Sequence, residues 1–264
     1  MTAARTVLIT GAAGLFGAFY AIAEAGGLFG GILRHHWGSR YQLRLADVRP
    51  VGELQAHEQF QCADIVDYPQ LLAACRDIDT VVHLAAYPGD GAEFYDTLLK
   101  LNVIGAYNAF EAARNAGCRR LVFASSIDAV KGYWDEGEAK LEVPVYPTNV
   151  YGATKCWGEA LGRVYAHQHG LSCICVRLCN PGFRQDGDWD PDDAMSGMSP
   201  RDAAQLLGLC IEAEDLDFAI VNGISEHRRG RLELKETRRI LGFSPADGTA
   251  FPKAAAAGKP VRRS

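Results

Sequence analysis

Tyr151 and Lys155 are four residues apart at the start of a helix that the sequence predicts over residues 151–167. Residues at this spacing lie on the same helix face, one turn apart, so the phenol and the ammonium are expected to be neighbours. A nearby cation stabilises a phenolate, and we therefore expect Tyr151 to lose its proton closer to neutral pH than a free tyrosine, whose pKa is about 10. The pair could act as a general base, although unrelated surface neighbours often have the same spacing.

Ser125 and Ser126 follow the apolar run of residues 121–124, which is typical of a buried strand. Open α/β sheets bind their ligands at the carboxyl ends of parallel strands. A serine hydroxyl at this point can hold a substrate oxygen beside Tyr151. The alternative interpretation is an ordinary turn after a strand.

A glycine-rich loop follows the first predicted strand, residues 6–10. Three glycines spaced three residues apart before a helix leave bare backbone N–H groups for a dinucleotide pyrophosphate, and the last glycine lets the helix pack closely on the strand. A tight turn without a ligand is the alternative. The expected cofactor contacts in this loop are Gly11, Ala13, Gly14, Leu15, Phe16 and Gly17.

Asp47 ends the second predicted strand, where a carboxylate can accept hydrogen bonds from both ribose hydroxyls and would repel a 2′-phosphate. This favours NAD, while Arg49 keeps NADP possible and a simple turn residue is the alternative. Asp47 follows Gly11 by 36 residues, whereas about 20 are expected. The excess falls in residues 17–43, where the glycine pairs 26–27 and 30–31 are expected to break the helix.

Further apolar runs predict strands at residues 80–84, 120–124, 174–178 and 218–221, and apolar periodicity predicts helices at 68–75 and 94–116. Ser199 and the proline after it predict the start of another helix. Strands that alternate with helices indicate an α/β fold, a Rossmann-type doubly wound parallel sheet. We expect a dinucleotide-binding domain over residues 1–178, a small, dependent substrate lobe over 179–252 and a disordered tail over 253–264.

The composition is that of a globular protein: 264 residues, 48% hydrophobic and 22% charged, with a net charge of −5. This balance indicates neither a nucleic-acid partner nor a membrane partner. The eight cysteines lack the spacing of a zinc site and are expected to be reduced thiols, with no bound metal. Because no leader sequence precedes the first strand, a cytoplasmic location is expected.

The order of glycine loop, acid, Ser-Ser and Tyr-x-x-x-Lys resembles the extended short-chain dehydrogenases/reductases, also called the NAD-dependent epimerase/dehydratase family, from about Thr6 to about Phe243. The resemblance implies that Ser126 orients and polarises the substrate oxygen and that Tyr151 transfers the proton. It implies that Lys155 holds the nicotinamide ribose and lowers the pKa of Tyr151. It also implies a homodimer formed through residues 94–116 and 151–167.

The resemblance extends to further positions. It implies adenine contacts at Asp64 and Ile65, a stretch beneath the nicotinamide that follows His83, and a helix asparagine at Asn102. Asn180 matches a substrate-pocket position, with a turn-capping asparagine as the alternative. The stretch after His83 consists of Leu84, Ala85 and Ala86, and the expected substrate-binding residues are Pro88, Ser125, Ser126, Ile127, Asp128, Asn180 and Arg184.

Within the family, the chain resembles uronate dehydrogenases, which oxidise C1 of a hexuronic acid to a lactone, around residues 122–126 and 151–156. Their Asn-His after the serine pair is replaced here by Ile127-Asp128, and their carboxylate-binding arginine falls in the acidic run of residues 186–193, where Arg184 is the nearest compensating charge. A neutral sugar or polyol is therefore favoured as the substrate of an NAD-dependent dehydrogenase. An epimerase or dehydratase with tightly bound NAD is the alternative, and a non-catalytic dinucleotide-binding regulator is a third.

Overall fold

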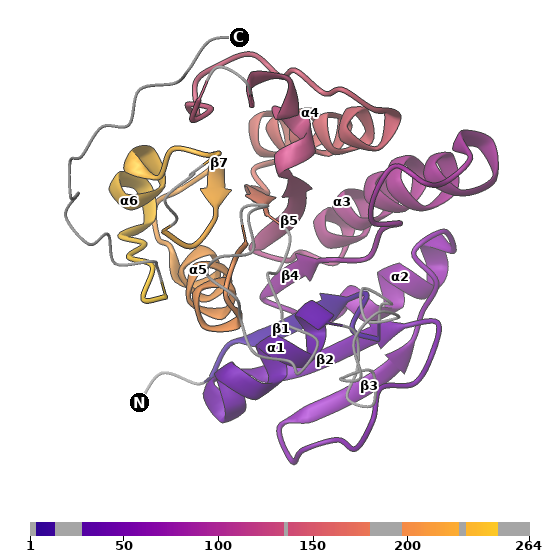
Figure 1. Cartoon of the computed structure of the whole chain (residues 1–264). Helices are drawn as coiled ribbons and strands as arrows, with labels where there is room; N and C mark the ends of the chain where they lie inside the picture. Colours follow the sequence, from indigo (N-terminus) through magenta and orange to yellow (C-terminus); the bar gives the residue numbers. More distant parts are fainter. Residues whose placement is uncertain (1–3, 14–27, 135–136, 180–196, 227–230, 248–264) are drawn as a thin grey trace, which may run out of the picture.

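The computed structural model describes residues 4–13, 28–134, 137–179, 197–226 and 231–247, and within them it forms a seven-stranded sheet in the order β3-β2-β1-β4-β5-β6-β7 (Figure 1). All neighbouring strands are parallel. The order reverses between β1 and β4, which is the point where open α/β sheets bind ligands. The strands are β1 (Thr6–Thr10), β2 (Gln42–Asp47), β3 (Glu58–Cys62), β4 (Thr80–His83), β5 (Arg120–Ser126), β6 (Ser172–Leu178) and β7 (Phe218–Gly223).

Helices cover both faces of the sheet, which confirms the predicted Rossmann-type fold (Figure 1). One face packs against α2 (Tyr68–Cys75), the π-helix η3 (Phe94–Ile104), α3 (Gly105–Asn115) and α4 (Val150–His169). The other face packs against α1 (Leu28–Trp37) and α5 (Pro200–Glu212), while α6 (Lys235–Leu241) lies beside β7. Short 3-10 turns are η2 (Gly38–Arg40), η4 (Ile127–Ala129) and η5 (Lys131–Tyr133). None of the described helices is long and apolar enough to cross a bilayer.

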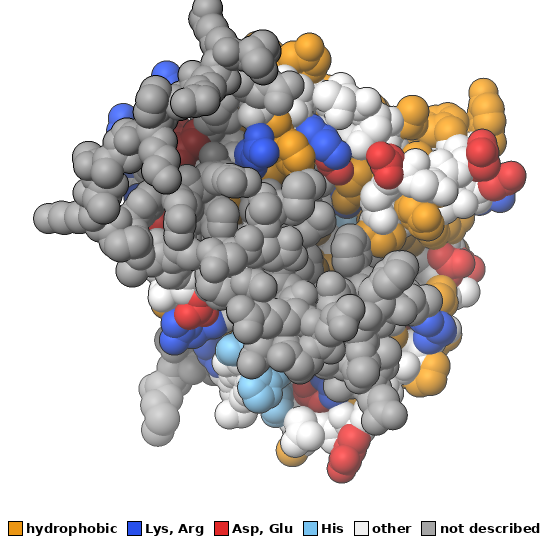
Figure 2. Space-filling view, in the orientation of Figure 1, with side chains coloured by type: hydrophobic (Ala, Val, Ile, Leu, Met, Phe, Trp, Pro, Cys, Tyr) orange, Lys and Arg blue, Asp and Glu red, His pale blue; other side chains and the backbone are white. Residues whose placement is uncertain are grey.

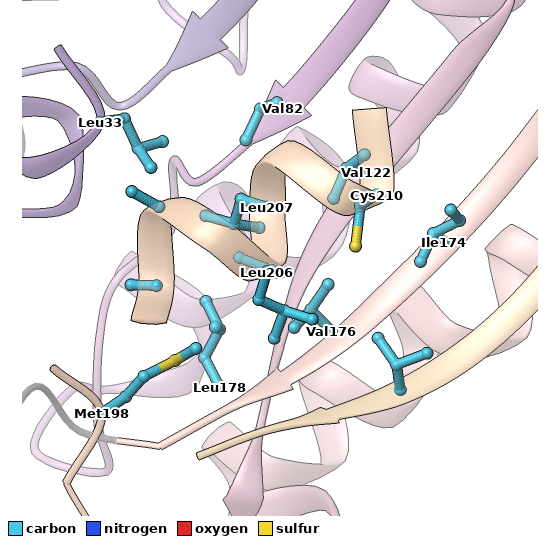
Figure 3. Packing of buried hydrophobic residues seen from close by; sticks show 14 of the residues in the cluster. Leu33, Val82, Val122, Ile174, Val176, Leu178, Met198, Leu206, Leu207 and Cys210 are labelled. Atoms are coloured by element: carbon cyan, nitrogen blue, oxygen red, sulfur yellow. The ribbon is translucent and has the colours of Figure 1, made fainter. Parts of the chain in front are cut away.

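Helix α5 fills the centre of one layer of the core. Figure 3 shows Leu206 and Leu207 of α5 between Leu33 of α1 and the strand residues Val122 and Val176, all of which are buried. The predicted start of this helix is confirmed, because the Ser199 side chain accepts the backbone N–H of the third helical residue and a proline occupies the first turn.

The chain after residue 178, where the sequence predicts a dependent lobe, contributes to the same sheet and core. Strand β7 pairs with β6 as the last strand of the same sheet, and α5 packs into the same core as α1. Residues 200–223 therefore share one sheet and one core with the strands before residue 178, and the predicted division into a domain and a dependent lobe stays a prediction. The physical reason is that β6 is almost wholly buried and needs a neighbour on its outer edge. The predicted tail, residues 253–264, lies outside the described residues.

Two local predictions differ from the structure. The helix predicted over 94–116 is divided into a π-helix and an α-helix that meet at Gly105. Strand β3 was not predicted because its sequence is mostly polar, and parallel pairing to β2 makes it a strand.

The predicted helix break at the glycine pair 30–31 is wrong, since α1 runs through both residues. The pair 26–27 lies outside the described residues. Helix α1 accommodates Gly30 because this residue packs against the turn after β1, and the packing outweighs the low helix propensity of glycine.

Candidate active site

The turn after β1 is built around Gly11. Its φ is +73°, and an added Cβ would lie 2.7 Å from both the backbone N and the Cα of Ala85. Only glycine avoids strain here, so the backbone of the turn stays bare at the carboxyl edge of the sheet. Thr10 connects this turn to β4, because its hydroxyl lies 2.8 Å from Nδ1 of His83 and accepts the N–H of Ala85 at 3.4 Å.

Asp47 lies beside this turn at the end of β2. Its Oδ2 accepts the N–H of Ala13 at 2.9 Å, and its Oδ1 accepts the N–H of Arg49 at 3.1 Å. The Arg49 side chain donates to the carbonyl of Ala13 at 2.8 Å. A carboxylate has further lone pairs after these two bonds, and they can accept ribose hydroxyls. The predicted cofactor contacts Gly14, Leu15, Phe16 and Gly17 lie outside the described residues.

Asp64 and Ile65 follow β3 at the same edge of the sheet. The Asp64 carboxylate accepts the N–H of Val66 at 2.9 Å and is half-buried. Ile65 is buried, and Asn108 donates to its carbonyl at 2.9 Å. The loop that the resemblance assigns to adenine is thus held in place from α3.

Helix α4 brings Tyr151 beside Ser126. Asn149 caps the helix by accepting the N–H of Gly152 at 2.6 Å. A Cβ on Gly152 would lie 2.5 Å from the carbonyl oxygen of Asp128, so glycine allows the first turn of α4 to approach the segment after β5. Ser126 is near enough to the Tyr151 side chain as a result to favour its charged form.

The direction of the Tyr151 pKa differs from the expectation. Burial raises the pKa of Tyr151 to about 12, the hydrogen bond from Ser126 opposes this rise, and the charge of Asp128 adds to it. The predicted lowering by Lys155 is therefore not seen. The physical reason is that the phenol is only 9% exposed, and removing a phenolate from water costs more than its neighbours return.

Lys155 is buried one turn further along α4. Its Nζ donates to the carbonyl of Ala124 at 2.8 Å and lies 5.5 Å from the centre of the Tyr151 ring and 5.3 Å from that of Phe123. Burial lowers the pKa of Lys155 to about 8. Burial also lowers the pKa of His83, to about 3, and the positive charge of Lys155 contributes to this shift. His83 is therefore neutral at physiological pH.

Asn102 links the loop after β4 to α4. Its side chain accepts the N–H of Tyr87 at 2.8 Å and donates to the Tyr87 carbonyl and to the Thr154 hydroxyl, both at 3.1 Å. Thr154 in turn donates to the carbonyl of Tyr151 at 2.7 Å. Thr154 was missed by the sequence analysis, although it lies inside the Tyr-x-x-x-Lys motif. Pro88 follows Tyr87 in the loop that Asn102 holds and is half-buried.

Ser125 and Ser126 point to opposite sides of β5, as successive strand residues do. The Ser125 hydroxyl donates to Glu159 at 2.7 Å, and Glu159 forms a buried ion pair with Arg177 at 2.8 Å. Ser125 thus belongs to the interface between the sheet and α4, and we do not retain it as a substrate ligand. Sequence analysis missed the Glu159–Arg177 pair because nothing local connects the two residues.

The remaining predicted substrate residues differ in their placement. Ile127 is buried in the core on the side of α5. Asp128 is half-buried and pairs with Lys131 at 3.3 Å. Asn180 and Arg184 lie outside the described residues.

These groups fit a dinucleotide cofactor. The turn at Gly11 leaves no room for a side chain, and the Asp47 carboxylate beside it has acceptor capacity left. The half-buried stretch 84–86 follows β4 and lies against the same turn. The arrangement can hold a substrate oxygen, remove its proton and stabilise a ribose.

Comparison with known proteins agrees with this geometry. The model of the NAD-dependent epimerase/dehydratase family matches residues 7–207. NAD-dependent glucose-6-phosphate dehydrogenase of Haloferax volcanii is 33% identical over 248 residues, which are 87% of this chain and 93% of that protein. L-arabinose 1-dehydrogenase (NAD(P)(+)) of the same organism is 33% identical over 211 residues, 71% of this chain and 82% of that protein.

A crystal structure of a uronate dehydrogenase mutant from Agrobacterium tumefaciens, complexed with NAD, superposes with a TM-score of 0.76. It is 28% identical, and the match covers 92% of this chain and 85% of that chain. Similarity across the whole fold, together with the glycine turn and the Ser126, Tyr151 and Lys155 cluster, leads to one assignment: the chain belongs to the NAD-dependent epimerase/dehydratase family.

Proposed function

We propose that this protein is an NAD-dependent dehydrogenase that oxidises the anomeric carbon of a small sugar to a lactone. The observation that carries the proposal is the buried cluster at the carboxyl edge of the sheet, in which Ser126 lies beside Tyr151 and Lys155 lies one helical turn away. The names of the relatives support a sugar substrate, since glucose-6-phosphate, L-arabinose and uronate are all sugars or sugar derivatives.

The chain's own residues have three tasks in this reaction. Ser126 holds and polarises the oxygen on C1, and Tyr151 removes the proton of that hydroxyl. NAD, when bound, accepts the hydride that leaves C1. Loss of this proton and hydride turns the cyclic hemiacetal into a lactone, and the tyrosine carries the proton until it is passed to solvent. Lys155 binds the nicotinamide ribose.

A base of this kind has to work as the phenolate. Because burial raises the pKa of Tyr151 to about 12, the phenolate needs a compensating positive charge. The ammonium of Lys155 lies on the same helix face, and its pKa of about 8 means that it is mostly charged at neutral pH. We assign this charge compensation to Lys155 as its second task, and burial outweighs its effect on the pKa of Tyr151 in the structure.

We also propose that the protein is a cytoplasmic homodimer formed through η3, α3 and α4. Buried free thiols such as Cys173 and Cys210 suit a reducing compartment. Hydrophobic side chains lie on the side of the molecule where α3 and α4 are found (Figures 1 and 2). Tyr95 of η3 is 77% exposed, Tyr107 of α3 46% and Trp157 of α4 41%, and exposed aromatic side chains on neighbouring helices suit a subunit interface.

The first experiment measures formation of the reduced nicotinamide, NADH or NADPH, by the purified protein with neutral aldoses, sugar phosphates, hexuronates and polyols, each with NAD and with NADP. Turnover with one class of sugar, lost in Tyr151→Phe and strongly reduced in Ser126→Ala, supports the proposal. Ser125→Ala is the matched control, because its hydroxyl bonds to Glu159 and lies on the other side of the strand. We expect it to keep its turnover number and to lose only stability.

Silence across the whole panel would count against a dehydrogenase. If NAD also copurified with the protein and nucleotide sugars were interconverted without net NADH, the epimerase or dehydratase alternative would replace this proposal.

A further inference from the structure

The sequence Gly-Leu-Phe-Gly occurs twice in this chain, at residues 14–17 and at residues 27–30. The two copies are thirteen positions apart. The first copy completes the glycine spacing after β1, whereas the second copy coincides with the start of α1 at Leu28. A dinucleotide site needs only one glycine at the place where the helix packs on the first strand.

Gly30, in the second copy, lies at this place in the structure. A Cβ on Gly30 would be 2.5 Å from the carbonyl oxygen of Ala12 and 2.9 Å from its Cα. The atoms in the way belong to the backbone of the turn after β1, so they cannot move aside as a flexible side chain could. Gly30 therefore has the role that the last glycine of a dinucleotide-binding turn plays, which is to bring helix and strand into direct contact.

The position of α1 is set by its second half, which is anchored in the core. Leu33 is fully buried, and Trp37 is 6% exposed with its indole N–H donating to the carbonyl of Ala204 at 2.9 Å. With these residues in place, the helical repeat puts Gly30 one turn before Leu33 and against Ala12. The contact thus follows from the packing of a whole helix and not from one loop.

Sequence spacing gives an independent reason. Gly11 and Asp47 are 36 residues apart, and removing one thirteen-residue period leaves 23, close to the value of about 20 typical of this motif. Removal of residues 18–30 joins Gly17 directly to residue 31. The shortened chain then reads Gly-Ala-Ala-Gly-Leu-Phe-Gly after Thr10, an uninterrupted glycine motif.

We propose that Gly30, and not Gly17, is the glycine that lets the first helix of the NAD site pack against the turn after β1. We further propose that residues 18–30, which carry the second Gly-Leu-Phe-Gly copy, are dispensable for NAD binding. The proposal rests on NAD binding as part of the proposed function, but not on the identity of the sugar. It makes Gly30 a positioning residue, because its own atoms do not take part in the chemistry.

The test compares NADH binding, followed by the fluorescence of the reduced nicotinamide, in matched glycine variants. In the full chain we expect Gly30→Ala to weaken NADH binding by about ten-fold or more, and Gly17→Ala to leave it within about two-fold. In the variant that lacks residues 18–30 we expect NADH affinity close to that of the full chain. In this deletion variant, Gly17→Ala is expected to weaken NADH binding as much as Gly30→Ala does in the full chain.

The decisive result is that Gly30→Ala weakens NADH binding in the full chain, whereas Gly17→Ala does so only in the deletion variant. Should Gly30→Ala fail to fold, the deletion variant and its Gly17→Ala derivative still decide the question. The proposal is overturned if Gly17→Ala weakens NADH binding in the full chain while Gly30→Ala does not, or if the deletion variant is folded by circular dichroism and no longer binds NADH. A full chain that binds NADH but oxidises no sugar would refute the proposed function and leave this inference standing.

Discussion

Replacing Lys155 by methionine is expected to abolish turnover and, at the same time, to make the protein more stable at neutral pH. Lys155 is 5% exposed, and its ammonium donates one hydrogen bond, to the carbonyl of Ala124. Burial lowers the pKa of Lys155 from 10.5 to about 8. That difference corresponds to a cost of about 3 kcal/mol for keeping the charged form in the folded protein.

The cost depends on pH with a definite sign. Below pH 8 the ammonium is charged in both the folded and the unfolded chain, so the full cost applies. Between pH 8 and pH 10.5 the unfolded chain binds more protons than the folded chain, and the stability of the wild type rises with pH. Integration over this window predicts that the free energy of unfolding of the wild type rises by about 2 kcal/mol between pH 7 and pH 9.5. Lys155→Met lacks the titrating group, so its stability does not rise for this reason.

Urea unfolding of the wild type and Lys155→Met at pH 7 and pH 9.5 measures the effect. The methionine variant is expected to be more stable by about 3 kcal/mol at pH 7 and by about 1 kcal/mol at pH 9.5. Lys140→Met is the control, because Lys140 is exposed, and its stability difference should not change with pH. A gap for Lys155→Met that is the same at both pH values, or a variant less stable than the wild type at pH 7, would refute the reasoning.

Three further predictions concern Gly11, His83 and Glu159. Gly11→Ala should lower both the melting temperature and NADH affinity, because the added Cβ would lie 2.7 Å from the backbone of Ala85 and residue 11 has a φ of +73°. Unchanged NADH affinity in a binding titration would show that this turn does not face the cofactor. His83 has a pKa of about 3 because it is buried, against 6.5 when unfolded, so the stability it contributes is complete above pH 6.5 and is lost as the pH falls toward 3. Acid titration monitored by circular dichroism should show a shallower loss for His83→Gln, and an identical curve would contradict this. Glu159→Gln leaves Arg177 buried without its carboxylate and should destabilise the fold by about 3 kcal/mol in urea unfolding, with partial recovery in the double variant Glu159→Gln/Arg177→Gln. A single variant as stable as the wild type would disprove the role of the pair.

Local patterns in the sequence were sufficient for most of the fold and for the order of the site. Short apolar runs predicted six of the strands, and the helix spacing that brings Tyr151 and Lys155 together is a property of any α-helix. The helix cap at Ser199 follows from residue type. Because parallel strands end at one edge of the sheet, these elements also imply that the loops meet there.

Tertiary structure decided the features that depend on distant neighbours. Which of the two serines faces Tyr151 follows from the side of β5 on which Glu159 lies, and which Gly-Leu-Phe-Gly copy meets Ala12 follows from the packing of α1. Strand β7 joined the sheet because β6 needed a partner at its edge.

The protonation behaviour of the site was decided in the same way. The Tyr-x-x-x-Lys motif by itself predicted a lowered pKa for Tyr151, and burial in the folded chain raises it instead. Sequence determines which groups are neighbours along a helix or a strand end. Desolvation and close packing are sums over atoms from many segments, and only the folded chain brings those atoms together.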